Sequence, residues 1–101
     1  MEDVDEKIRS ELGESLLREV DVGLRGRKMV DRIVVSDDVV YVIEIEDELN
    51  YIAIGQALVY SELYKQKYLE KREVKPVIVC SKMDLDLMFA CEKLGIKVIN
   101  L

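Results

Sequence analysis

The sequence predicts a single α/β domain in which helices flank a mixed central sheet, in the order α-β-β-β-α-β-α-β. Three observations lead to this prediction. The chain has 101 residues, close to the commonest size of one domain, and 50% of them are hydrophobic while 36% are charged. Apolar residues recur at helical spacing in three segments and at strand spacing between those segments. Repeats, linkers and low-complexity stretches do not occur, so we expect one domain over residues 1–101.

The first element is expected to be a helix over residues 3–19. Asp3 or Asp5 is suited to cap its N-terminus, since a carboxylate there accepts hydrogen bonds from free backbone N–H groups. The apolar residues that recur every four positions are Val4, Ile8, Leu12, Leu16 and Val20. This spacing predicts a helix with one apolar face.

Three strands are expected next. The β-branched segment 20–25 and the segment 29–35 are separated by a basic turn around Gly26, which indicates a hairpin. After the turn Ser-Asp-Asp, residues 39–46 form the strongest strand pattern in the chain. Val40, Val42, Glu44 and Glu46 leave this strand on one face, because side chains alternate along a strand.

The second half of the chain predicts a helix, a strand, a helix and a strand. The long helix is expected over residues 51–72, and Pro76 marks the latest point at which it can end. Residues 76–80 are apolar without alternation, which is typical of a strand covered on both faces. A helix over 84–94 and a last strand over 97–101 complete the predicted order.

Composition excludes several classes of function. The chain has no His, and Cys80 and Cys91 are too far apart for a CxxC pair, so zinc sites and His-based catalysis are excluded and both thiols are expected to be buried. The acidic start is unlike a signal peptide, and no apolar run approaches the ~20 residues that span a membrane. We therefore expect a cytoplasmic protein with no membrane contact. Its net charge of −6 opposes non-specific attraction to nucleic acid.

Three carboxylates interrupt otherwise apolar strands. Asp31 lies inside one strand of the predicted hairpin pair, and Glu44 and Glu46 lie on the same face of the next. If the two strands are neighbours, Asp31 and Glu44 come close together, and such carboxylates ionise readily only with a cation between them. An all-oxygen ligand set suits Mg²⁺ or Mn²⁺. The alternative is that both glutamates are solvated and that Asp31 pairs with Arg32 or Arg27.

These residues resemble the motif of the PD-(D/E)XK nucleases, the superfamily of restriction endonucleases. The resemblance consists of Asp31 and, thirteen positions later, Glu44-Ile45-Glu46 on the following strand. Gln56-x-x-x-Tyr60 on the next helix is similar to the QxxxY motif of the RecB-like branch, and Glu11 lies where many members carry a supporting Glu. The order of elements agrees over essentially the whole chain and is closest to that of small nuclease-like proteins of archaea.

The chain departs from the superfamily at two positions. Glu46 stands where the superfamily usually carries Lys, which positions or activates the attacking water, and Val30 replaces a Pro before Asp31. The first change removes the only cation from the cluster. It makes the site more dependent on metal, and it also increases the chance that catalysis has been lost.

The resemblance implies a role for each residue. Asp31 and Glu44 are the expected ligands of Mg²⁺ or Mn²⁺, and Glu46 is expected to act as a general base or as a further ligand. Glu11 is expected to hold a metal-bound water. Gln56 and Tyr60 either steady the site or form a polar boundary of a packed helix. The residues expected to contact phosphates, unless they form a solvated turn, are Arg25, Arg27, Lys28 and Arg32.

The leading functional hypothesis is a metal-dependent nuclease that hydrolyses phosphodiester bonds, with DNA as the expected substrate. The alternatives are a catalytically inactive nuclease-like module that binds a partner or dimerises, and an unrelated three-layer α/β domain. A homodimer is also expected, because the long helix carries two apolar stripes. Ile52, Val59 and Leu63 are expected to cover the sheet, and the second stripe, which includes Tyr64 and Tyr68, is expected to form the dimer interface. The alternative is that the last helix covers one of the two stripes.

Overall fold

The computed structural model describes residues 3–101. Within this range the order of elements agrees with the prediction. The elements are α1 (Val4–Leu12), β1 (Leu16–Asp21), β2 (Met29–Val35), β3 (Val39–Glu48), α2 (Tyr51–Tyr68), β4 (Glu73–Lys82), α3 (Leu85–Lys93) and β5 (Lys97–Asn100). The predicted mixed α/β fold is confirmed.

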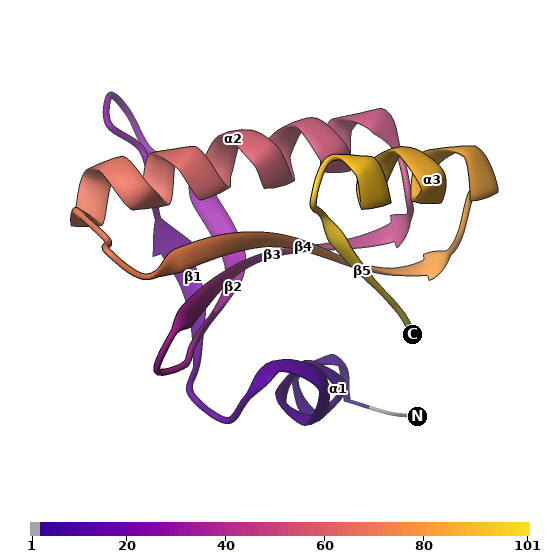
Figure 1. Cartoon of the computed structure of the whole chain (residues 1–101), viewed down its shortest axis with the longest axis horizontal. Helices are drawn as coiled ribbons and strands as arrows, with labels where there is room; N and C mark the ends of the chain where they lie inside the picture. The colour runs from indigo at the N-terminus through magenta and orange to yellow at the C-terminus, as the bar shows by residue number, and fades with distance from the viewer. Residues whose placement is uncertain (1–2) are drawn as a thin grey trace.

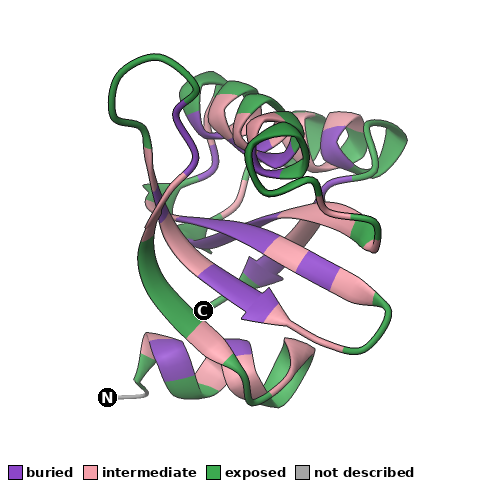
Figure 2. Ribbon diagram, turned by 90° about the vertical axis from the view of Figure 1, so that its left-hand side faces the viewer, coloured by how far each residue is buried: buried purple, intermediate pink, exposed green. Residues whose placement is uncertain are grey.

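The five strands form one sheet in the order β1-β2-β3-β4-β5. The first three strands pair antiparallel, and β3, β4 and β5 pair parallel. Helix α1 covers one face of the sheet, and α2 and α3 lie side by side on the other (Figure 1). The core has two sides as a result. Ile8 of α1 packs with Ile43 and Val77 on one face of the sheet, and Ala57 of α2 packs with Ile78 on the other. Figure 2 shows buried segments in the sheet and in the helices that cover it.

The first helix is shorter than predicted. It ends at Leu12, and Gly13 caps it with a φ of 139°, a backbone conformation that favours glycine. Leu16 and Val20 belong to β1 instead, and the predicted strand over 20–25 is mostly loop. The prediction was wrong because residues four apart also share a face of a strand, so the spacing alone does not separate the two structures.

The ends of α2 and β4 also differ from the prediction. Helix α2 ends at Tyr68, where Leu69 takes a left-handed conformation with a φ of 48°. Strand β4 begins at Glu73 and includes Pro76, which was expected to mark the limit of the helix and the start of the strand. Pairing with β5 begins only at Val77, so one edge of β4 is open at Pro76, a position that tolerates proline.

The apolar stripes of α2 differ from the prediction. Leu63 packs against the core, as expected of a residue that covers the sheet. Ile52 and Val59, expected to cover the sheet, are 71% and 52% exposed, whereas Tyr64, expected at an interface, is only 8% exposed. The buried residues of the helix are Ala53, Ala57, Ser61 and Tyr64. Small side chains let the helix lie close to the sheet, and the Ser61 hydroxyl donates to the carbonyl of Ala57, so its polarity does not oppose burial. The predicted burial of Cys80 and Cys91 is confirmed.

Candidate metal centre and nucleic-acid interface

Strands β2 and β3 separate at Asp31. Their ladder runs from Val35 to Arg32, which pairs with Ile43, and the pairing stops there. One residue further, the Asp31 carboxylate accepts a hydrogen bond of 2.8 Å from the backbone N–H of Ile45. The carboxylate thus accepts the hydrogen bond that a backbone carbonyl of β2 would accept in a regular ladder, and this bond fixes it in the gap between the two strands.

Glu44 lies beside this gap and is only 3% exposed. Burial is the largest cause that raises its pKa, to about 9, followed by a side-chain hydrogen bond with Asp31 and the negative charges of Asp31 and Glu46. A backbone hydrogen bond from Asp31 opposes the shift. One carboxyl oxygen of Glu44, Oε1, is buried and has no hydrogen-bond partner. The predicted approach of Asp31 to Glu44 is therefore found in the structure.

This arrangement fits a divalent cation held by two carboxylates. A buried, unpartnered carboxyl oxygen is costly in a protein interior, and a cation would satisfy it and favour the ionised form. Within residues 3–101, no three Asp, Glu, Cys or His side chains are arranged to hold a metal ion together. Glu46 therefore acts on Glu44 through its charge without joining it in a three-carboxylate cluster. Mg²⁺ commonly binds through one or two carboxylates and waters, so the pair is a sufficient ligand set.

Gln56 and Tyr60 lie on the side of the sheet that also carries Glu44. Both are half-buried on a flank of α2, and Tyr60 packs against the core cluster that includes Val30 and Val42. Glu44 follows Val42 on the same face of β3, because alternate residues share a face. The predicted QxxxY pair is thus brought to the same layer as the carboxylates.

Two predicted site residues lie elsewhere. Glu11 is exposed on α1, across the sheet from α2, with its carboxylate 3.6 Å from the ammonium of Lys7. Arg32 is held by Asp5, since its Nε lies 2.6 Å from Asp5 Oδ1, so its guanidinium is not free to contact a phosphate. Neither residue joins the Asp31–Glu44 pair.

Asp5 is a buried carboxylate that the sequence did not single out for its interactions. It is 3% exposed and accepts hydrogen bonds from Arg18 and Arg32, residues 13 and 27 positions away. Burial opposes ionisation of Asp5, but the two arginine hydrogen bonds outweigh it and lower the pKa. The sequence signal was its place beside Val4 and Ile8, at the edge of the apolar face of α1.

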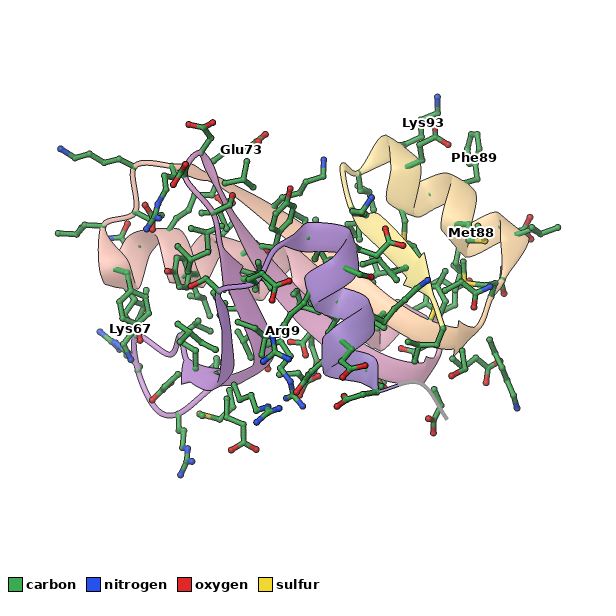
Figure 3. All side chains as sticks on the ribbon, turned by 90° about the horizontal axis from the view of Figure 1, so that it is seen from below. Arg9, Lys67, Glu73, Met88, Phe89 and Lys93 are labelled. Atoms are coloured by element: carbon green, nitrogen blue, oxygen red, sulfur yellow. The ribbon has the colours of Figure 1, made fainter. Side chains whose placement is uncertain are left out.

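The basic turn predicted around Gly26 is the loop between β1 and β2. Arg25, Arg27 and Lys28 are exposed on it, as a phosphate contact requires. The loop extends beyond the sheet near the C-terminal end of α2, and Lys67 of α2 reaches it (Figure 3). Three of the four predicted cationic residues are therefore grouped on one exposed loop.

Comparison with known proteins shows what the fold is similar to. No protein-family model and no curated protein matches the chain. The structure resembles the crystal structure of a repair endonuclease from Pyrococcus abyssi, with a TM-score of 0.70 and 21% sequence identity. The match covers 100% of this chain and 48% of that chain, so this chain spans about half the length of the endonuclease. The chain therefore has a nuclease-like fold.

Among residues 3–101, no helix is both long enough and apolar enough to cross a membrane.

Proposed function

We propose that the protein is a metal-dependent nuclease of the PD-(D/E)XK type that hydrolyses phosphodiester bonds of DNA. The observation that carries the proposal is the Asp31–Glu44 pair, with its buried and unpartnered oxygen, at the point where β2 and β3 separate. The similarity of the fold to that of a repair endonuclease supports it.

Each residue has a role in this proposal. Asp31 and Glu44 hold Mg²⁺ or Mn²⁺, which when bound activates water and stabilises negative charge on the phosphate. Glu46, whose charge acts on Glu44, accepts the proton of the attacking water. Gln56 and Tyr60 steady the site from α2. The exposed residues that hold the DNA backbone are Arg25, Arg27 and Lys28.

The second candidate is a nuclease-like module that binds nucleic acid without cleaving it. Glu46 in place of the usual Lys favours this candidate, because the charges that shift the pKa of Glu44 are then both acidic, those of Asp31 and Glu46. The two candidates differ in whether the protein cleaves the DNA that it binds.

Metal binding is tested by thermal unfolding in a Mn²⁺ titration. A ligand that binds only the folded state stabilises it by about 2.7 kcal/mol at a hundredfold excess over Kd, so the melting temperature should rise with Mn²⁺. Glu44→Gln should abolish the rise, because it keeps the shape of the neutral carboxyl and removes the anionic ligand. Glu48→Gln is the matched control on an exposed part of β3 and should respond as wild type. Equal responses from all three proteins would contradict the metal site.

Cleavage is tested on linear, branched and single-stranded DNA with Mg²⁺ or Mn²⁺. Wild type should cleave at least one substrate and Glu44→Gln should cleave none. A protein that binds Mn²⁺ and DNA but leaves every substrate intact would support the non-catalytic module.

We also propose that two copies pair through the outer face of α2. This face exposes Ile52 and Val59, and between them lies Gly55, where a Cβ would meet no atom within 4 Å. The helix follows the exposed acidic residues Asp47 and Glu48 and carries Lys65 and Lys67 in its last turn. In an antiparallel pair the acidic residues that precede each helix would face the basic last turn of the other helix.

Light scattering at micromolar concentration tests this pairing. We expect twice the chain mass of 11.7 kDa for wild type, and a monomer for Val59→Glu because it buries a charge at the centre of the interface. Leu17→Glu, at a 51% exposed position on β1, should stay dimeric. A monomeric wild type would disprove the interface.

A further inference from the structure

The loop between β1 and β2 is closed at its base by a carboxylate. Asp21 Oδ1 accepts hydrogen bonds from the backbone N–H groups of Gly23, at 2.9 Å, and Lys28, at 3.1 Å. Between these contacts the N–H of Val22 donates to the carbonyl of Lys28 at 2.8 Å. One side chain therefore fixes both ends of the loop.

Two glycines allow the loop to fold this tightly. A Cβ at Gly23 would lie only 1.8 Å from the carbonyl oxygen of Gly26, so the two backbone segments are in direct contact. Gly26 has a φ of 78°, which favours glycine over other residues. The path of the loop is thus set by its own backbone.

Helix α2 holds the loop from outside. The ammonium of Lys67 donates to the carbonyl of Gly23 at 3.0 Å, and the hydroxyl of Tyr68 donates to the carbonyl of Asp21 at 2.7 Å. Both contacts link residues more than forty positions apart in the chain. The loop is a preorganised element rather than a free turn, and preorganisation reduces the entropy lost on binding.

The tip of this element combines one apolar side chain with three cations. Leu24 is 53% exposed, and Arg25, Arg27 and Lys28 around it are also exposed. The loop projects from the body of the molecule, clear of α1 (Figures 1 and 2). Among the described residues, Leu24 belongs to none of the hydrophobic core clusters, so its apolar side chain has no evident role in stabilising the fold.

The loop is also close to the candidate metal centre. Lys28 precedes Met29, the first residue of β2, and lies three residues before Asp31, about 10 Å along an extended chain. DNA whose backbone contacts Lys28 would therefore lie near Asp31.

We propose that the segment Gly23–Lys28 is a wedge that inserts Leu24 between base pairs of duplex DNA while Arg25, Arg27 and Lys28 hold the adjacent phosphates. The inference rests on the proposed function, since it assumes that the ligand is nucleic acid. The aliphatic tip selects the duplex: proteins that unstack a duplex insert Leu, Ile, Met, Phe or Pro, whereas single-strand binders stack bases on aromatic rings, and this segment has none.

The test measures binding to a duplex that contains 2-aminopurine, a base whose fluorescence rises when it unstacks, in EDTA so that no cleavage occurs. Wild type should bind the duplex and raise the fluorescence. Leu24→Ala should weaken binding about tenfold, abolish the rise and leave the salt dependence unchanged. Arg27→Gln should instead lower the slope of log K against log salt by about 1.

Two comparisons make the result decisive. Leu17→Ala removes a leucine of matched exposure, 51% against 53%, from β1 and should behave as wild type. A Leu24→Ala protein that still unstacks the duplex, or a wild type that binds single strands better than duplex, overturns the wedge. Cleavage with Mn²⁺, assayed in parallel, decides the proposed function separately. If the protein unstacks the duplex but does not cleave it, the wedge is supported and the nuclease activity is contradicted. If it cleaves equally with and without Leu24, the nuclease activity is supported and the wedge is contradicted.

Discussion

Two carboxylates on opposite sides of the sheet are equally buried and behave in opposite ways. Asp5 belongs to α1, Glu44 lies on the face of the sheet that α2 covers, and each is 3% exposed. Burial opposes ionisation in both, but Asp5 is bonded to Arg18 and Arg32 and its pKa is lowered. Glu44 has Asp31 and Glu46 as neighbours, and its pKa is raised to about 9. Burial raises the pKa of both acids; the arginine partners reverse this at Asp5, whereas the acidic neighbours of Glu44 add to it.

The difference separates a structural charge from one that is available for chemistry. Both oxygens of Asp5 have arginine donors, so its electrostatic requirements are met within the chain. Glu44 keeps an unpartnered oxygen and like-charged neighbours, and a bound cation would relieve both. Strongly perturbed carboxyl groups of this second kind are frequent at functional sites.

The largest expected effect comes from removing each acid in turn. Asp5→Ala should lower the free energy of unfolding by about 3 kcal/mol, because it leaves Arg32, which is only 23% exposed, without its partner. Glu44→Gln should not lower it at neutral pH, since Gln imitates the protonated carboxyl that the fold favours and needs no protonation. Urea denaturation in EDTA measures both values, and a larger loss for Glu44→Gln would contradict the contrast.

The role of Glu44 could be predicted from the sequence, whereas Asp5 was predicted only as a possible N-cap, a position that Asp3 takes. Asp31 and Glu44 were visible because each interrupts an apolar strand, and strand pairing brings neighbouring interruptions together. The partner of Asp5 was not readable, since Arg32 reaches it from 27 positions away and across two elements. The alternative that Asp31 pairs with the side chain of its neighbour Arg32 was plausible from spacing, but that guanidinium contacts only the backbone carbonyl of Asp31.

Packing distance explains why the wrong face of α2 was predicted to cover the sheet. The order of elements followed from periodicity and from turn residues, and it was right throughout the described chain. Which face of α2 meets the sheet depended on how closely the helix approaches, and the small residues Ala53 and Ala57 were given less weight than Ile52 and Val59. The size of the apolar side chains along a helix does not by itself show how closely the helix approaches the sheet.

The second expected effect is a pH dependence of opposite sign at the two acids. The folded-state pKa of Asp5 lies below its ordinary 3.8, so the stability it contributes is present above that pH and is lost as the pH falls through the folded value. Glu44 is raised from 4.5 to about 9, so its contribution is full below pH 4.5 and is lost as the pH rises toward 9. Glu44→Gln should remove this upper slope, which reaches about 1.4 kcal/mol per pH unit at its steepest.

Urea midpoints from pH 4.5 to 9 in EDTA measure this slope. Glu48→Gln, at an exposed position of β3, is the control and should keep the wild-type profile. If the urea midpoints of wild type and Glu44→Gln change with pH in the same way, the pKa of Glu44 is not raised in the folded protein. The proposed difference between Glu44 and Asp5 would then be wrong.

The smallest expected effect on stability, and the sharpest test of the contrast, comes from placing a cation beside Glu44. Glu46→Lys would give Glu44 a positive neighbour, as Arg32 is for Asp5. Its pKa should fall, the slope above pH 4.5 should flatten, and stability at neutral pH should rise by less than about 1 kcal/mol because position 46 is partly exposed. The Mn²⁺-induced rise in melting temperature should shrink, since the added charge repels the cation.

Cleavage by the same variant separates the two roles that Glu46 can have. If Glu46 handles the attacking water, Glu46→Lys should retain Mg²⁺-dependent cleavage, because Lys performs that task in the superfamily that we propose for the chain. Loss of existing cleavage would instead make Glu46 a cation ligand. Glu48→Lys adds the same charge at an exposed position two residues along β3 and should leave the pH profile, the Mn²⁺ response and cleavage unchanged. If it matches Glu46→Lys in all three, the effect is one of net charge and Glu46 has no special place beside Glu44.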